Sequence, residues 1–236
     1  MTLLRRAFRR RFHGGGFTPA DPHAARESPS PVLFIGESFG AAALSRELNR
    51  EGFATLAIDA RPLFSRARGG GGGVDGAVDA LHEHIASMRC GAPPVAFAHG
   101  LGVALAIAYL ESWPLGGLVA LSPLSPTPRK TIARWLAATA PVEADERTMA
   151  ALGAFLNSGD AEAAADAAAF ALALEPTRLE GGSVRMLALR VGSDVFSSPD
   201  DLDDFSAHHA ISPSDARTED ECGARAAAKQ WLLAHY

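Results

Sequence analysis

The chain lacks the features that mark membrane, disulfide-rich and nucleic-acid-binding proteins. No stretch of its 236 residues approaches the roughly 18 uninterrupted apolar residues of a transmembrane helix. Its two cysteines, Cys90 and Cys222, show neither metal-ligand spacing nor a disulfide framework. The glycine run at 69–73 lacks the lysine and the serine or threonine of a phosphate-binding loop. A formal net charge of −5 gives no reason to expect nucleic acid as a partner. Together these absences lead us to expect a soluble domain without metal or cofactor.

The first 20 residues lack any acidic residue, since the first is Asp21. Leu4, Phe8 and Phe12 recur there at the spacing of one helical face. A basic amphipathic segment of this kind resembles a mitochondrial targeting presequence. We therefore expect residues 1–30 to be a targeting segment and linker and residues 31–236 to be one domain. The expected compartment is the mitochondrion, with a plastid or the cytoplasm as alternatives. The basic residues are Arg5, Arg6, Arg9, Arg10 and Arg11.

From residue 31 onward, short apolar runs alternate with helical patterns. Such alternation predicts an α/β fold with a mostly parallel sheet flanked by helices. With 47% hydrophobic and 21% charged residues, the chain can fill the core of one such domain. The expected strands lie at 31–35, 53–58, 94–98, 115–121, 184–190 and about 208–211, and the expected helices at 41–50, 74–89, 103–111, 199–205 and in the last residues up to Leu233.

The turn after the strand at 94–98 reads Ala98-His99-Gly100-Leu101-Gly102. Together with Ile35-Gly36 after the first strand and Ala57-Ile58-Asp59-Ala60-Arg61 after the second, it resembles the α/β-hydrolase superfamily. In that family the turn reads G-x-S-x-G, and its serine is the nucleophile. Gly100 stands at the serine position, and glycine has no side chain with which to form an acyl-enzyme. The resemblance therefore implies an α/β-hydrolase fold without its central nucleophile.

Of the two remaining members of the family's catalytic triad, the acid has a counterpart in this sequence and the histidine does not. Gly192-Ser193-Asp194 resembles the turn that presents the acid, but a carboxylate alone only orients a histidine. We expect Asp194 to cap this turn or the next helix instead. The family's histidine corresponds to Ala216, in the loop 213–217 before the final helix. His208 and His209 lie earlier, and we interpret them as strand or surface residues.

Residues 124–182 stand where the family inserts its variable lid. Helical patterns at 131–138, 143–156 and 161–174 predict helices that cover the carboxyl ends of the strands. In an active relative such a lid shapes a substrate pocket. Because the nucleophile is missing here, we expect these helices to serve packing.

A complete G-x-S-x-G occurs elsewhere, as Gly36-Glu37-Ser38-Phe39-Gly40 between an apolar strand and a helix. If Ser38 is a nucleophile, the upstream strands of the family must come from the first 30 residues, which are rich in arginine, glycine and proline. On the preferred alignment the same segment is the oxyanion loop, where the backbone N–H of Glu37 would bind a developing negative charge. The partners of Ser38 would be Asp59 with His99, or Asp194 with His209.

Three functions follow from these patterns. The preferred one is a catalytically inactive α/β-hydrolase-fold protein that acts as a structural or interaction subunit, with other protein subunits as partners, in a mitochondrial assembly. The first alternative is a serine esterase or thioesterase-like hydrolase that uses Ser38. The second alternative binds a small molecule in the vestigial pocket, where Gly100 vacates the volume of a serine side chain. This vestigial site comprises Gly36, Glu37, His99, Gly100, Leu101, Gly102 and Asp194.

Overall fold

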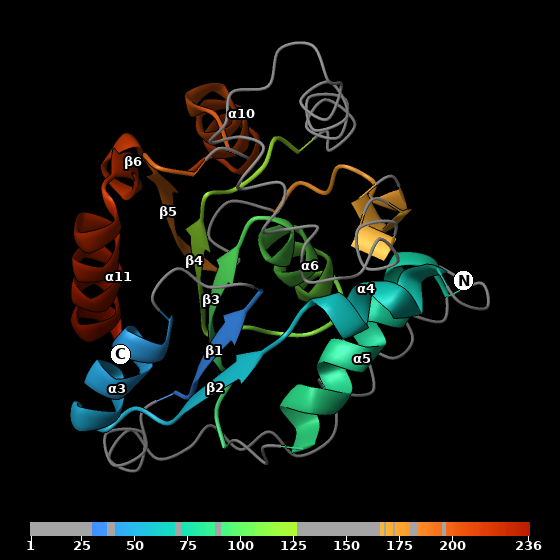
Figure 1. Cartoon of the computed structure of the whole chain (residues 1–236), viewed down its shortest axis with the longest axis horizontal. Coiled ribbons are helices and arrows are strands. Elements are labelled where there is room, and N and C mark those ends of the chain that lie inside the picture. The colour runs from blue at the N-terminus through green and yellow to red at the C-terminus, as the bar shows by residue number, and fades with distance from the viewer. Residues whose placement is uncertain are drawn as a thin grey trace.

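The computed structural model contains a six-stranded sheet in the order β2-β1-β3-β4-β5-β6 (Figure 1). All neighbouring strands are parallel, which confirms the predicted class of fold. The strands are β1 (Val32–Ile35), β2 (Thr55–Ile58), β3 (Val95–His99), β4 (Gly117–Leu121), β5 (Arg185–Val191) and β6 (Ala216–Glu219). The structure describes residues 30–36, 41–68, 72–87, 91–126, 166–167, 169–171, 173–179, 184–194 and 197–236.

Helices cover both faces of this sheet, as the two sides of Figure 1 show. One face carries α3 (Ala41–Arg50) and α11 (Glu221–His235). The other face carries α4 (Arg61–Arg68), α5 (Gly73–Ser87), α6 (Leu101–Leu110) and α10 (Pro199–His209). None of the helices within the described ranges is long and apolar enough to cross a membrane.

The central strands are apolar on both sides because helices cover both sides. In β1, Leu33 and Ile35 pack under α4, α5 and α6, whereas Val32 and Phe34 pack under α3 and α11. This alternation follows from the two-residue period of a strand. The ring of Phe34 contacts that of Phe97 in β3, with 5.4 Å between the ring centroids. Burial on both faces explains why the strands read as continuous apolar runs rather than as alternating patterns.

The expected strand at 208–211 is wrong. α10 continues through His209 and ends at Ala210, whose φ of 54° is left-handed. The last strand is instead β6, which pairs with β5 after a short 3-10 turn, η1 (Pro213–Asp215). Leu202, Phe205 and His209 are buried at helical spacing, and this period of three to four residues keeps the segment helical.

Part of the expected lid belongs to the core. Residues 166–167, 169–171 and 173 are helical, as predicted for 161–174. Phe170 is fully buried, with its ring centroid 4.7 Å from that of Phe64 in α4. This helical part therefore packs against the domain. The helices expected at 131–138 and 143–156, and the targeting segment at 1–29, lie outside the described residues.

Candidate functional site

The elbow between β3 and α6 is a left-handed turn at a glycine. Gly100 has φ 55° and ψ −119°. Its N–H donates to the carbonyl oxygen of Leu121 at 3.0 Å, and its own carbonyl accepts from the N–H of Val103 at 3.1 Å. A Cβ added at Gly100 would meet no atom of the described residues within 4 Å. The turn has the strained backbone that presents a nucleophile above a sheet, but it carries no side chain.

Two further glycines allow segments to approach this elbow closely. A Cβ at Gly102 would lie 2.5 Å from the carbonyl oxygen of Ile35, so α6 can lie this close to β1 only with glycine there. Gly36 has φ 97°, and a Cβ on it would lie 3.1 Å from the carbonyl oxygen of His99. The end of β1 therefore lies beside the end of β3. The structure brings together Gly36, His99, Gly100, Leu101 and Gly102.

His99 and Asp194 meet across the carboxyl end of the sheet. His99 is the last residue of β3, Asp194 follows β5, and β4 lies between these two strands. The Nε2 atom of His99 lies 2.9 Å from Oδ2 of Asp194, with 22% and 8% of the two side chains exposed. A carboxylate at this distance holds an imidazole ring in one orientation. The fold thus adds a histidine–carboxylate pair to the vestigial site.

Of the two capping roles expected for Asp194, the one at the next helix is wrong, and the one at its own turn stays a prediction. α10 begins at a capping box, in which Ser198 Oγ accepts from the N–H of Asp201 at 3.2 Å. In return, the N–H of Ser198 donates to Oδ2 of Asp201 at 2.8 Å. Sequence reasoning named both His99 and Asp194 without pairing them, because the pairing depends on the strand order.

No histidine stands directly after the last strand. Ala216 opens β6 and pairs with Ala188 of β5, so its predicted place in a loop is wrong. The residue between β6 and α11 is Asp220, whose Oδ1 accepts from the N–H of Gly223 at 2.6 Å and caps α11. The position directly after the last strand is therefore occupied by a helix cap.

His208 and His209 lie in α10 and bind a neighbouring segment. Nε2–H of His208 donates to the carbonyl oxygen of Thr177 at 3.1 Å. Nδ1 of His209 accepts from the N–H of Leu179 at 3.5 Å. Burial, together with the charges of His208 and Arg178, lowers the pKa of His209 to about 4, so its ring is neutral at pH 7. Through these two hydrogen bonds the histidines hold residues 177–179 against α10.

The second G-x-S-x-G motif, Gly36 to Gly40, cannot be placed in the same way, because Glu37 and Ser38 lie outside the described residues. Ser38 therefore stays a prediction, both with Asp59 and His99 and with Asp194 and His209. The described residues include no group of three or more histidine, cysteine, aspartate or glutamate side chains that could hold a metal ion.

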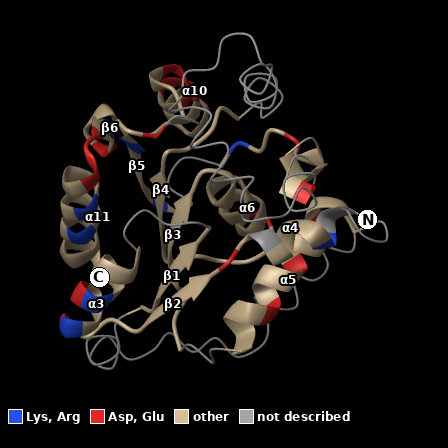
Figure 2. Cartoon of the chain, in the orientation of Figure 1, with Lys and Arg blue, Asp and Glu red and all other residues tan. Residues whose placement is uncertain are grey.

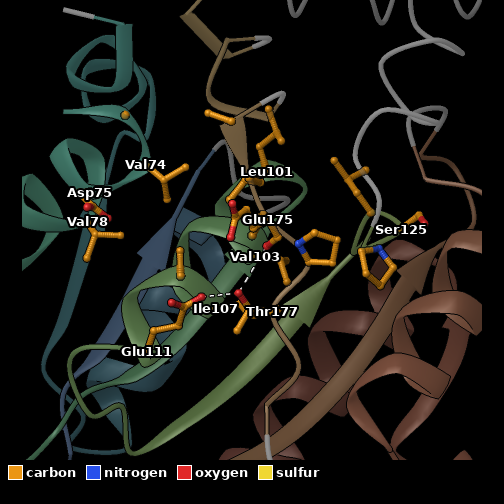
Figure 3. A pocket seen from close by; sticks show the side chains of 18 of the residues that line it. Val74, Asp75, Val78, Leu101, Val103, Ile107, Glu111, Ser125, Glu175 and Thr177 are labelled. Carbon is orange, nitrogen blue, oxygen red and sulfur yellow. Dashed lines mark hydrogen bonds between the residues drawn. The ribbon is translucent and has the colours of Figure 1, made fainter. Parts of the chain in front are cut away.

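A cavity of about 460 Å³ lies beside α6 (Figure 3). Its walls come from α5, α6, α10 and the segments around 125 and 175, and its lining is part apolar and part polar. Leu101 belongs to its lining, but His99, Gly100 and Asp194 do not. The cavity therefore adjoins the vestigial site at Leu101 but does not include the pair of His99 and Asp194. The polar lining residues are Asp75, Glu111, Ser125, Glu175, Thr177 and His209.

No family model and no curated protein matches the chain. Solved structures match over most of its length. A thermophilic esterase from Thermogutta terrifontis gives a TM-score of 0.56 at 15% identity, over 89% of this chain and 92% of the other. A proline iminopeptidase-related protein from Thermus thermophilus gives 0.51 at 18% identity, over 88% and 90%. A monoacylglycerol lipase from Paleococcus ferrophilus gives 0.50 at 16% identity, over 89% and 97%. At these identities the similarity extends to the fold alone.

Proposed function

We propose that this chain, which has the α/β-hydrolase fold, is catalytically inactive and acts as a structural or interaction subunit. The observation that carries the proposal is Gly100, which keeps the backbone of the elbow but offers no hydroxyl or thiol. Acyl transfer starts with the attack of such a group on the acyl carbon, and that bond cannot form at a glycine side chain. A rigid scaffold with surfaces for partners remains.

The pair of His99 and Asp194 supports this proposal. In acyl transfer on this fold, the acid orients a histidine that removes a proton from the nucleophile. Here the carboxylate of Asp194 binds the residue directly before the elbow, and Gly100 has no hydroxyl to deprotonate. The pair then joins the carboxyl ends of β3 and β5. Its role is to stabilise this end of the sheet, and it takes no part in a reaction.

Labelling with a fluorophosphonate probe tests the inactivity. The wild-type protein and Ser38→Ala should both stay unlabelled under conditions that label an active serine esterase. Labelling of the wild type that disappears in Ser38→Ala would identify Ser38 as a nucleophile and contradict the proposal. Gly100→Ser is the matched variant: labelling that appears only there would attribute the loss of activity to this one position.

The proposed partners are other protein subunits, and the proposed compartment is the mitochondrion. The pattern of residues 1–20 supports the compartment. Residues 1–30 fused to a fluorescent protein should direct it to mitochondria, and replacing the five arginines by glutamine should abolish this. A cytoplasmic or plastid signal from the unchanged fusion would contradict the compartment. Purification of the tagged protein from mitochondria, with Gly100→Ser as a second bait, would then identify partners.

Binding of a small molecule is the second candidate function. The observation that favours it is the cavity beside α6, since about 460 Å³ lies within the roughly 300–1,000 Å³ of ligand pockets. Non-covalent binding there requires no nucleophile. It is therefore compatible with an inactive elbow.

A further inference from the structure

We propose that the cavity beside α6 binds a small organic cation that has an apolar body and a hydrogen-bond acceptor. The inference rests on the second candidate function, and it names the site and the class of ligand. Three properties of the cavity lead to it: apolar side chains in its lining, a described lining whose charged residues are all acidic, and the ring of His209.

The apolar side chains of the lining come from three helices and the segment after β4. Figure 3 shows Val74 and Val78 on one side, and Val103 and Ile107 along α6. Leu124 and Phe205 complete this surface. An aromatic or branched aliphatic body placed there would be removed from water, which favours binding.

The charged residues of the described lining are all carboxylates. Asp75 lies in the first turn of α5, Glu111 follows α6, and Glu175 lies on the segment that faces them. The described lining contains no lysine or arginine. Figure 2 shows further acidic residues on α5 and α10, the helices on either side of the cavity. Arg178, next to Thr177, lies outside this lining, and its charge acts on His209. The carboxylates of the lining favour a cation over a carboxylate or phosphate.

Glu111 is the carboxylate whose position is fixed. Its Oε1 accepts a hydrogen bond from Oγ1–H of Thr177, across the cavity from α6 to the facing segment (Figure 3). A carboxylate held in this way loses little side-chain entropy when a ligand binds. We therefore place the cationic group of the ligand beside Glu111.

His209 supplies the donor. The residue is only 4% exposed and lines the cavity. Since Nδ1 accepts the N–H of Leu179, the proton of the neutral ring is on Nε2, and none of the described residues accepts it. An acceptor on a ligand within reach of this N–H would add a hydrogen bond to binding. Because its pKa is lowered to about 4, the ring adds no positive charge at pH 7.

Three benzamides of matched size test the inference by calorimetric titration of the full-length protein. N-(2-aminoethyl)benzamide carries an ammonium group, N-propylbenzamide is neutral, and N-benzoyl-β-alanine carries a carboxylate. All three have an aromatic ring and a carbonyl acceptor. We expect the amine to bind most tightly, the neutral compound about fivefold more weakly, as for the loss of one partly screened charge pair, and the acid not at all.

Two variants locate the binding. Glu111→Gln keeps an acceptor for Thr177 and should weaken the amine about fivefold while leaving the neutral compound unchanged. Glu83→Gln, an exposed residue of α5 outside the lining, removes the same charge and should change neither. Ala104→Phe fills the cavity and should abolish all binding. Circular dichroism and thermal unfolding establish that each variant is folded.

Equal affinity for the three compounds, or an unchanged amine affinity in Glu111→Gln, would overturn the cationic class of ligand. Binding that survives in a folded Ala104→Phe variant, or no binding of any compound to the wild type, would overturn the site. Neither result affects the fluorophosphonate experiment, so failure of this inference is distinguishable from failure of the proposed inactivity.

Discussion

Two adjacent residues of the elbow are constrained by different forces. Gly100 is held by the backbone, whose φ of 55° is one that residues with a Cβ rarely adopt. His99 is held by its side chain, through the bond to Asp194. The first constraint acts on any residue at position 100, whereas the second requires two particular side chains. Substitutions at the two positions should therefore have different consequences.

Gly100→Ala should lower the free energy of unfolding by about 1–2 kcal/mol. The cost is backbone strain alone, since the added Cβ meets no atom of the described residues within 4 Å. Urea denaturation measures it. Gly91→Ala is the matched control, because a Cβ there also meets no described atom and its φ is not left-handed. Equal effects of the two substitutions would show that the elbow is not strained.

A double-mutant cycle of His99→Ala and Asp194→Ala measures their bond. We expect a coupling free energy of about 1 kcal/mol, as for a hydrogen bond to a partly exposed charged group. The measurement is the denaturation midpoint of the two single variants and the double variant. If the two single effects add, then the 2.9 Å contact does not contribute to stability.

α6 is the element on which the elbow and the cavity both depend. Most of its residues are buried, because it lies between the sheet and the helices of the same face. Gly102 in its first turn allows it to lie against the carbonyl of Ile35 in β1. The other side of the helix forms one wall of the cavity. A shift of α6 would therefore change both places.

Gly102→Ala should destabilise the protein by about 1–3 kcal/mol. The methyl group would lie 2.5 Å from a backbone oxygen, and neither strand nor helix can move without losing contacts of its own. Thermal unfolding measures the loss. The same variant should also weaken binding of N-(2-aminoethyl)benzamide. An unchanged melting temperature would show that α6 can move away from β1 at no cost.

At the scale of the whole molecule, residues 174–179 are fastened by polar contacts to two helices. Thr177 bonds Glu111 next to α6 and His208 in α10, and Leu179 bonds His209. The last contact requires a neutral imidazole, because Nδ1 must accept a proton. Protonation of His209 would therefore break one of these contacts, and this links the stability of the domain to pH.

The free energy of unfolding should fall as the pH is lowered from 6.5 to 4. The pKa of His209 is about 4 in the folded protein and 6.5 when unfolded, so between these values the unfolded chain binds the additional proton. This residue contributes a slope of at most about 1.4 kcal/mol per pH unit, with greater stability at higher pH.

Urea denaturation at several pH values, with wild type and His209→Gln, tests this linkage. The loss of stability between pH 6.5 and 4 should be smaller in His209→Gln. His84→Gln, at an exposed position of α5, is the control and should follow the wild type. Parallel curves for wild type and His209→Gln would contradict the burial of a neutral histidine.

The α/β fold was predictable from residues close together in the chain. Continuous apolar runs such as 31–35 and 94–98 read as strands because both faces of the sheet are covered. The prediction was wrong at 208–211, where α10 ends, and at Ala216, which opens the short polar strand β6. No apolar run marks β6 in the sequence. Edge strands with one covered face carry a weaker signal.

The sequence by itself determined the alternation of strands and helices and the absence of a side chain at Gly100, because these depend on residue type and local period. The tertiary structure alone decided that His99 pairs with Asp194, that His209 is buried and neutral, and that a cavity lies beside α6. The physical reason is distance. Residues 95 positions apart in the chain come within 2.9 Å only through the order of the strands, and desolvation exists only once the helices have packed.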